Sequence, residues 1–484
     1  MLPLLAALIL TAPAPDDPKP DAPSAMSVVE AIESVMIDAI AKAEASVVAI
    51  DRTLGENSER TLAVRGRNPA GAGPRGFIDP HLPPGMIDLR LTDPRDTAIS
   101  FDYGSGVVIG ERGEILTAFS VVQGASRLRV KSPNRRSFEA EVVAADPRSD
   151  LAVIAPREGL SPAELGLKPI RMGDATKLRK GSLLIALGNP YNAARDGKAS
   201  ASWGILSNFA RKIEPFPSEP QLRHYPTLLQ LDTKLNLGMS GGAVVDIRGE
   251  LVGLTTTAAN AGGFDSQAGY AIPLDRLGLR IVRTLLEGRE AEYGFLGIQL
   301  SPDGSSRVAG SSPNSPAALG GLVVNDEIVT IDGIPVDDGA SLVAAVNSFE
   351  PGKAIEVGLR RNEAPLTKSV ILAKFPVRGE VIATNRPPSW RGIHVDYLSI
   401  LPNAEFGGVL FDMMKYGGVA VREVDPGSPA ADAGLQPGQV ITMVSGKRLD
   451  SPQRFREFVK GLEGKIQITT NRGQTVEIAD DKQP

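Results

Sequence analysis

The chain has 484 residues, which is too long for a single hydrophobic core and favours about three domains. Its formal net charge of -5 provides no basic field for phosphate backbones, so we expect no nucleic-acid partner. Because the chain has no cysteine and only three histidines, disulfides, thiolate nucleophiles, zinc–thiolate sites and histidine-rich metal sites are excluded, and no metal or cofactor is expected.

The N-terminus begins with an apolar run, MLPLLAALIL, which is followed by small residues. The run has the length of a signal-peptide core and is too short to span a bilayer. It lacks the usual preceding basic residues, so a misassigned start codon or a buried strand stays open. Residues 16–24 are rich in Pro and Asp, as linkers are. We predict that residues 1–25 are a signal-like segment and linker, and that the protein is exported to the periplasm or cell envelope.

A helix, a strand and a long loop are predicted before the main run of strands in the first domain. Apolar side chains recur at helical spacing over residues 26–45, which predicts an amphipathic helix that docks on that domain. A strand is predicted at 46–51, and an inserted loop at about 52–97, where Gly, Pro and Arg dominate without a period. Between residues 102 and 274 about ten short β-branched runs alternate with turn signals, which predicts a sandwich or a pair of barrels.

The C-terminal part contains an internal repeat. A predicted helix at 277–288 leads into two similar segments, NSPAALGGLVVNDEIVTIDGIPV at 314–336 and GSPAADAGLQPGQVITMVSGKRL at 427–449. In both, Ser-Pro-Ala-Ala opens a short helix, a glycine ends it, and a strand with a tight turn follows. We predict two homologous domains, at 290–380 and 388–480.

Three motifs in the first domain contain the candidate catalytic residues. They are GSGVVIGERGEILTAFSVV at 104–122, DPRSDLAVI at 146–154 and LQLDTKLNLGMSGGAVVD at 229–246. Together with GNP at 188–190 and GYAIP at 269–273, they resemble the HtrA family of exported trypsin-like proteases with C-terminal PDZ domains. The resemblance implies a mainly β fold, with a chymotrypsin-like double β-barrel over residues 26–288 followed by two PDZ domains.

The resemblance also places the catalytic triad. The family's aspartate falls on Asp150 and its nucleophile on Ser240, but the position of its histidine is occupied by Ser120. Ser120 and Asp150 are 30 residues apart and Asp150 and Ser240 are 90 apart, in the His, Asp, Ser chain order of this architecture. A single motif would be weak evidence, but three in this order support the alignment.

Loss of the histidine removes the base. Triad catalysis needs a group that accepts the nucleophile's proton near neutral pH and returns it to the leaving amine. The hydroxyl of Ser120 cannot do so, and Ser240 would stay a weak neutral alcohol. We therefore predict impaired catalysis, unless Ser120 is a sequence error. Shifting the alignment by one or two residues would not place a histidine at the triad position, because no histidine lies between His81 and His224.

Four other side chains could in principle act as the base. We interpret His81 in the predicted insert, His224 in a surface loop and His394 in the last domain as solvated residues. Lys234 lies six residues before Ser240 and would need burial to lower its pKa. An active endopeptidase with an unusual base therefore stays open as an alternative.

The oxyanion hole is predicted from the backbone amides of Gly238 and Ser240. In the family the residue at Met239 is usually Asn and the residue at Ala243 usually Pro, so the turn departs from the pattern at two positions. The two glycines after Ser240 are equally explained by the needs of a tight turn.

The two repeats are predicted to capture peptides. PDZ domains add a peptide C-terminus as a strand to a sheet edge, and a glycine-containing loop presents amides to its carboxylate. The predicted binding residues are Tyr293, Gly294, Phe295, Leu296, Gly297 and Ile298 in the first repeat, and Trp390, Arg391, Gly392 and Ile393 in the second. Segments 341–346 and 452–459 are predicted to be the groove helices. The alternative is that these apolar residues only fill the cores.

The sequence therefore favours a catalytically impaired HtrA-like protein that binds unfolded proteins or peptide C-termini in envelope protein quality control. The alternatives are an active serine endopeptidase and a PDZ scaffold. The resemblance implies homo-oligomers, in trimers or multiples of them.

Overall fold

A computed structural model describes residues 24–54, 103–157, 161–189, 197–211, 227–236, 238–256, 269–377, 380–401, 417–471 and 473–480. Residues 1–23 of the predicted signal-like segment and linker lie outside these ranges, as do most of the predicted insert at 52–97, His81 and His224. Within the described ranges, no helix combines the length and the apolar character needed to cross a membrane.

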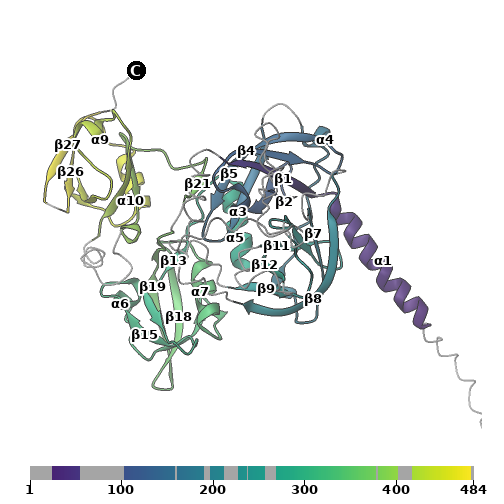
Figure 1. Cartoon of the computed structure of the whole chain (residues 1–484). Helices are drawn as coiled ribbons and strands as arrows, with labels where there is room; N and C mark the ends of the chain where they lie inside the picture. The colour runs from purple at the N-terminus through teal and green to yellow at the C-terminus, as the bar shows by residue number, and fades with distance from the viewer. Residues whose placement is uncertain are drawn as a thin grey trace, which may run out of the picture.

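The first half of the N-terminal domain is a closed barrel of six strands (Figure 1). Its order is β5-β4-β1-β2-β3-β6, and pairing of β5 with β6 closes it. Valine, isoleucine and leucine side chains fill its interior, because successive residues of a strand face opposite sides. The strands are β1 (Val47–Leu54), β2 (Tyr103–Val108), β3 (Ile115–Ala118), β4 (Ala125–Lys131), β5 (Ser137–Asp146) and β6 (Leu151–Pro156).

A second closed barrel, of order β10-β11-β12-β9-β8-β7, follows. It is built from β7 (Leu183–Gly188), β8 (Ser200–Arg211), β9 (Leu228–Leu231), β10 (Ala243–Val245), β11 (Leu251–Thr255) and β12 (Gly269–Pro273). The short elements of the domain are α3 (Phe119–Val122), α4 (Pro162–Leu165) and η2 (Ala175–Lys177). The two barrels confirm the predicted mainly β fold with a chymotrypsin-like double barrel.

The helix α5 (Arg276–Leu286) follows the second barrel, and the side chain of Asp275 caps its N-terminus. The first repeat domain comprises β13 (Gly294–Phe295), β14 (Ile298–Leu300), β15 (Val308–Ser311), α6 (Pro316–Leu319), β16 (Glu327–Ile331), β17 (Ile334–Pro335), α7 (Gly339–Asn347), β18 (Ala354–Arg361), β19 (Ala364–Ile371) and β20 (Ala373–Lys374).

The second repeat domain has a matching order of elements: β22 (Ile393–Asp396), η4 (Leu398–Ile400), β23 (Val419–Val424), α9 (Pro429–Asp432), β24 (Val440–Val444), β25 (Lys447–Arg448), α10 (Pro452–Val459), β26 (Ile466–Thr470) and β27 (Thr475–Ile478). The repeated Ser-Pro-Ala-Ala has the same role in both domains. Ser315 and Ser428 cap α6 and α9, and proline occupies the first turn.

The helix α1 (Ala25–Glu44) docks over only half of its length. Ala39 and Ala43 are buried against the barrels, but Met26 is 66% exposed and Ile32 is 50% exposed. The prediction of a docking helix is therefore corrected for the N-terminal half. The physical reason is visible in Figure 1, where that half projects beyond the barrels and no labelled helix or strand covers it.

The segment between the two repeat domains ties them to the first barrel. Its strand β21 (Ile382–Ala383) pairs with Ala144 and Ala145 of β5. Thr384 donates from both its amide and its hydroxyl to the carbonyl of Val143. The linker between the two repeat domains therefore adds a short strand to the sheet of the first barrel.

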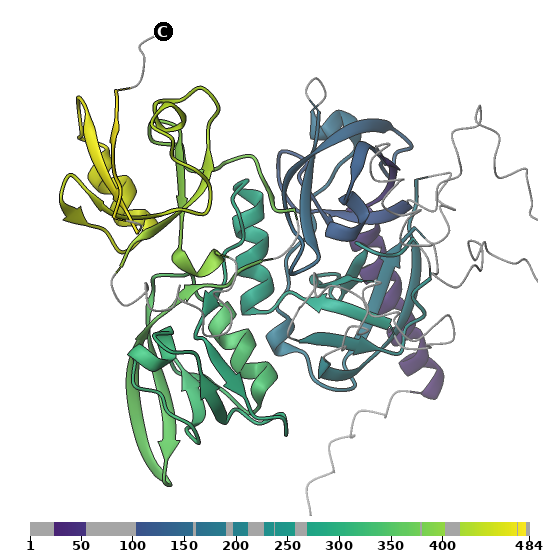
Figure 2. The same cartoon turned by 60° about the vertical axis from the view of Figure 1, so that its left-hand side comes forward.

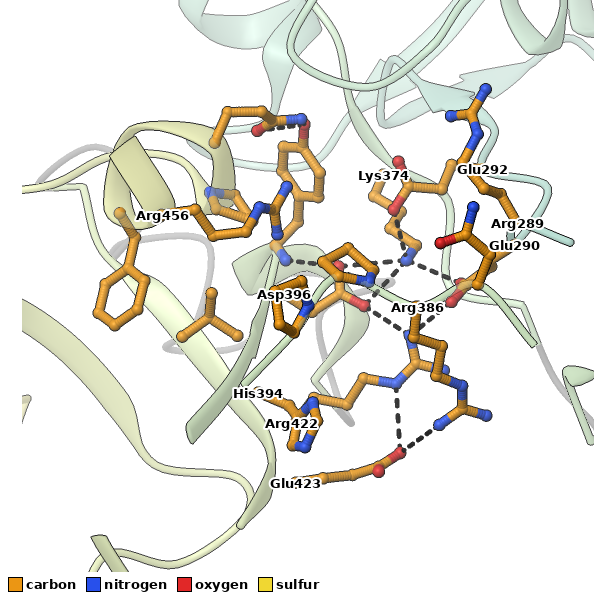
Figure 3. A pocket seen from close by; sticks show the side chains of 18 of the residues that line it. Arg289, Glu290, Glu292, Lys374, Arg386, His394, Asp396, Arg422, Glu423 and Arg456 are labelled. Atoms are coloured by element: carbon orange, nitrogen blue, oxygen red, sulfur yellow. Dashed lines mark hydrogen bonds and ion pairs between the residues drawn. The ribbon is translucent and has the colours of Figure 1, made fainter. Parts of the chain in front are cut away.

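A buried ion cluster joins the domains at the same place (Figure 3). The Lys374 ammonium, on a side chain only 3% exposed, lies 2.8 Å from Glu290, 2.9 Å from Glu292 and 2.8 Å from Asp396. Arg422 contacts Glu290 at 2.6 Å and Asp396 at 3.0 Å. Burial lowers the pKa of Lys374, but the three carboxylates outweigh it and hold the pKa above its usual value.

Removing this ammonium should loosen the junction. We expect Lys374→Met to destabilise it by about 3–5 kcal/mol, because the substitution removes the cation of Glu292 and leaves Glu290 and Asp396 to share Arg422. The measurement is urea unfolding, combined with amide hydrogen exchange in β22. The matched control is Lys353→Met, which breaks the more exposed pair with Asp332 and should cost less than about 1 kcal/mol. Equal effects of the two variants would contradict a structural role for the cluster.

Candidate active site

The carboxylate of Asp150 is held between the two barrels. Asp150 lies in the turn between β5 and β6 with φ 58°, a left-handed conformation. Its Oδ1 accepts the amide of Ser120 at 2.9 Å, from α3. Its Oδ2 accepts the hydroxyl of Thr256 at 2.8 Å, just after β11 of the second barrel. The carboxylate of Asp150 therefore contacts both barrels.

Ser120 contacts this carboxylate directly. Its hydroxyl lies 3.5 Å from Oδ2 of Asp150, a long hydrogen bond. Its carbonyl accepts from the Arg52 guanidinium at 2.7 Å, and Arg52 also donates to the carbonyl of Gln123. The backbone of α3 is thus anchored from β1, and the side chain that faces Asp150 carries no basic nitrogen.

Ser240 lies on the turn between β9 and β10 and is 7% exposed. Its carbonyl accepts the amide of Ser105 at 2.8 Å, which ties the turn to β2 of the first barrel. Its hydroxyl Oγ is buried and has no hydrogen-bond partner among the residues that the structure describes. A triad nucleophile transfers its proton to a hydrogen-bonded base, and Ser240 lacks such a contact.

The turn that presents Ser240 is built on left-handed glycines. Gly238 has φ 91° and Gly241 has φ 82°. A Cβ on Gly241 would stand 2.3 Å from the carbonyl oxygen of Ser105, so glycine is required there. The Ser105 hydroxyl donates to the Gly238 carbonyl at 2.8 Å and accepts the amide of Asn189 at 2.8 Å. The glycines are thus explained by the turn itself, as the sequence allowed.

The predicted oxyanion donors are available. Among the described residues, the amides of Gly238 and Ser240 donate to no acceptor. Met239 and Ala243, the departures from the family pattern, are both buried. The Met239 carbonyl accepts from the Thr255 hydroxyl and from the Gly242 amide, which fixes the turn from the second barrel. The turn can present its two amides to a carbonyl oxygen without an adjacent base.

The other candidate bases do not reach this site in the part of the chain that the structure describes. His394 lies in β22 of the second repeat domain, where its Nε2 is 2.8 Å from the Asp425 carboxylate. Lys234 is exposed to solvent, so it lacks the burial that a lysine base requires. His81 and His224 lie outside the described residues.

Sequence reasoning missed a junction next to Asp150. Tyr293, predicted to bind peptide, is buried and donates its hydroxyl to the Asp146 carboxylate. Arg148 donates to the Asn347 side chain at 2.9 Å and stacks 3.6 Å above the Phe375 ring. Burial raises the pKa of the Asp146 carboxyl despite its hydrogen bonds from Ser149 and Tyr293. The first repeat domain therefore holds the segment that ends at Asp150.

The loop of the first repeat keeps the features of a carboxylate site. Gly297 has φ 74°, and among the described residues the amides of Leu296 and Gly297 donate to no acceptor. The Leu296 side chain is buried in the domain core, Gly294 and Phe295 pair with β20, and Phe295 packs edge-to-face on Phe375. In the described part of the chain, β14 pairs only with β15, so its outer edge, which includes Ile298, is open.

The loop of the second repeat differs in its buried arginine. Arg391 is 3% exposed, and its guanidinium donates to the carbonyls of Leu462, Gly464, Ile478 and Ala479 and to the Asp480 carboxylate. Arg391 occupies the core position that Leu296 has in the first repeat. The backbone carbonyl of Leu296 accepts an amide of α6, and the backbone carbonyl of Arg391 accepts the equivalent amide of α9. Arg391 therefore ties down the C-terminal segment. Gly392 has φ 83°, Ile393 is buried, and Trp390 packs edge-to-face on Phe455.

The groove of the second repeat opens onto the domain junction. A pocket of about 220 Å³ lies between β22, α10 and the ion cluster (Figure 3). Tyr397 bridges to Gln453 of α10 at 2.9 Å and to the Pro351 carbonyl at 3.1 Å. No sequence signal identified this pocket, because its residues come from segments far apart in the chain.

Comparisons with known proteins agree with this architecture. Residues 104–254 match the trypsin-like peptidase domain family, and residues 294–372 and 421–468 each match a PDZ domain family. The repeat domains are therefore PDZ domains, as predicted.

Relatives with the same organisation are proteases. The chain is 30% identical over 384 residues to the periplasmic pH-dependent serine endoprotease DegQ of Escherichia coli K12, covering 76% of this chain and 78% of the relative. It is 28% identical over 385 residues to the periplasmic serine endoprotease DegP of the same organism, covering 77% and 75%. It is also similar to the solved HtrA-type protease AlgW with decapeptide, with 25% identity, 70% and 99% coverage and a TM-score of 0.46.

The geometry of Ser240 predicts its reactivity. A fluorophosphonate probe should fail to label it, because within the described part of the chain no base contacts the hydroxyl. The measurement is intact-protein mass after incubation with excess probe, with trypsin treated in parallel as a positive control. Rapid stoichiometric labelling that disappears in Ser240→Ala would contradict the prediction.

Proposed function

The chain belongs to the HtrA family of trypsin-like serine proteases with PDZ domains, and from that premise we propose that it is a catalytically impaired member. It binds unfolded proteins or peptide C-termini in the cell envelope without cutting them at an appreciable rate. The observation that carries this proposal is the Ser240 hydroxyl, which is buried without any hydrogen-bond partner.

The cost of the missing base is large. In a related triad, loss of the histidine reduces turnover by on the order of a million-fold. Ser120 contacts Asp150 as a histidine would, but its hydroxyl cannot accept a proton near neutral pH. What survives is the binding geometry, namely the Gly238 and Ser240 amides on a rigid turn.

The first PDZ domain is the better candidate for peptide capture. Its β14 edge is open, and the amides of Leu296 and Gly297 are available to a carboxylate. The second PDZ domain opens onto the ion cluster, and the linkage of Tyr397 to Gln453 lies beside its groove. We assign it mainly to fixing the domains.

Export and self-association belong to this proposal. The apolar run at residues 1–10 and the periplasmic relatives DegQ and DegP support an envelope location.

An active endopeptidase is the second candidate function. It is favoured only by the presence of Asp150 and Ser240 at the candidate site.

Restoring the base provides a direct test. Ser120→His places an imidazole next to Asp150, and we expect casein hydrolysis to rise about a hundredfold or more above the wild-type rate. The rate should increase with pH through the pKa of an imidazole, near 6.5 to 7. The matched control is Ser120→Gln, which adds similar bulk without a base, and activity should vanish in Ser120→His combined with Ser240→Ala. A folded but inactive Ser120→His would show that the missing base is not what limits catalysis.

Peptide capture by the first PDZ domain predicts a dependence on the free carboxylate. Amidating the C-terminus of an apolar peptide should weaken binding to the full chain by roughly a hundredfold, since two hydrogen bonds to a charged group are lost. Calorimetry compares acid and amide, and amide hydrogen exchange locates the peptide. Protection should appear in Ile298–Leu300 and not in Ile393–Asp396. Equal affinity for the two peptides would contradict a carboxylate clamp.

A further inference from the structure

Ser120 stands where the family has its triad histidine, and its side chain lacks the imidazole ring. Ser120 is partly exposed, and within the described ranges its hydroxyl makes a single hydrogen bond, the 3.5 Å contact with Oδ2 of Asp150. The segment before it lies against the Ser240 turn, because a Cβ on Gly241 would stand 3.0 Å from the amide nitrogen of Ala118. The place of the missing ring therefore lies beside the Ser240 turn and borders solvent.

The partners of a catalytic imidazole are in place between the two barrels, which lie against each other (Figure 2). The Asp150 carboxylate, which would orient the ring, accepts from the Ser120 amide and the Thr256 hydroxyl. The Ser240 hydroxyl, which would give up its proton, is buried and has no partner among the described residues. The amides of Gly238 and Ser240, which would hold the carbonyl oxygen, donate to no acceptor in the described part of the chain. Within that part of the chain, the site lacks only the base.

A bound polypeptide can carry the base itself. A histidine side chain has an unperturbed pKa of about 6.5, so at neutral pH most of it is uncharged and accepts a proton. The ligands of the proposed function are unfolded proteins, and an extended segment across the Ser240 turn presents successive side chains to opposite sides. The side chain directly before the attacked residue therefore points away from the attacked residue's own side chain.

We infer that the chain hydrolyses unfolded segments that supply their own base, namely a histidine directly before the residue whose carbonyl carbon is attacked. The imidazole of that histidine lies beside Ser120, donates from Nδ1 to the Asp150 carboxylate and accepts at Nε2 from the Ser240 hydroxyl. The inference rests on the proposed function, because it requires that the chain itself provides no base. It adds an activity that is confined to histidine-containing substrates.

The reaction balances with water as the only co-reactant. The substrate's Nε2 takes the Oγ proton of Ser240 while Oγ bonds to the carbonyl carbon, and the carbonyl electron pair moves to the oxygen held by the Gly238 and Ser240 amides. The imidazolium then gives that proton to the leaving amine as the C–N bond breaks. Water next attacks the ester. The imidazole takes one proton from the water and returns it to Oγ as the ester bond breaks, which leaves a carboxylic acid and free Ser240.

The second half of this reaction fixes the side on which the histidine must lie. A histidine before the cleaved bond stays in the acyl-enzyme and serves both halves, whereas a histidine after the bond leaves with the amine. A segment of the second kind would acylate Ser240 and stop, because no base remains to activate the water. Turnover therefore requires the histidine before the bond.

Three versions of one apolar peptide test the inference on the full-length chain. The first has histidine before the cleavage position, the second has Nε2-methylhistidine there, which blocks the accepting nitrogen at nearly the same size, and the third has histidine directly after the bond. The first should be cleaved about a hundredfold or more faster than the second, since general base catalysis contributes at least that much. The third should release at most one equivalent of amine per chain. Mass spectrometry should place the cleaved bond after the residue that follows the histidine, and acetyl and amide ends keep the peptide out of the PDZ carboxylate site.

Two variants show whether the activity belongs to this site. Ser240→Ala should abolish cleavage of the histidine peptide, and Ser120→Gln should reduce it to the rate of the methylhistidine peptide, because its side chain fills the place of the ring. The matched control is Ser126→Gln, which puts the same side chain on an exposed position of β4 and should leave the rate unchanged. Cleavage that survives Ser240→Ala or a folded Ser120→Gln would refute the inference.

The peptide series separates this inference from the proposed function. No cleavage of the histidine peptide would overturn the inference and leave the proposed function intact, since the chain would still bind without cutting. Rapid cleavage of all three peptides at equal rates would overturn both, because it would show that the chain has a base of its own.

Discussion

The carboxylate of Asp150 is one of the points at which the two barrels meet, and it holds the centre of the candidate site. It accepts one hydrogen bond from the backbone of α3 in the first barrel and one from Thr256 at the end of β11 in the second. Both contacts survive without a histidine, because an amide and a threonine hydroxyl supply them. The contacts that hold this carboxylate between the barrels therefore require no imidazole.

The segment that ends at Asp150 also contacts the first PDZ domain. Four residues before Asp150, the buried Asp146 carboxylate accepts the Tyr293 hydroxyl, and Arg148 is clamped between Asn347 and the Phe375 ring. The strand β21 extends the first barrel with residues of the linker, and Lys374 contacts three carboxylates from two segments. Because such buried charges are costly when unpaired, the domains are held in one arrangement and do not behave as tethered modules. The first PDZ domain is thereby held, with the outer edge of β14, in a fixed position relative to the first barrel.

Much of this could be anticipated from periodicity and motif order. Alternating β-branched runs predicted the barrels, the repeated Ser-Pro-Ala-Ala predicted the paired domains, and helical spacing predicted α1 and α5. The roles of single side chains were less predictable. Tyr293 and Arg391 stand in loops whose pattern indicates peptide binding, but their side chains are buried and serve the domain junction and the C-terminal strand. The sequence also did not predict how much of α1 is buried, because an apolar stripe indicates burial without giving its extent.

The sequence by itself determined the fold class, the two PDZ repeats and the absence of a histidine between residues 81 and 224, since these depend on residue types and their order. Only the tertiary structure decided which groups meet. It brought Thr256 to Asp150, left the Ser240 hydroxyl buried without a partner, and gathered Lys374, Glu290 and Asp396 into one cluster. These contacts join residues separated by tens to more than a hundred positions, and no local pattern encodes them, because they arise from how closed barrels and docked domains pack in space.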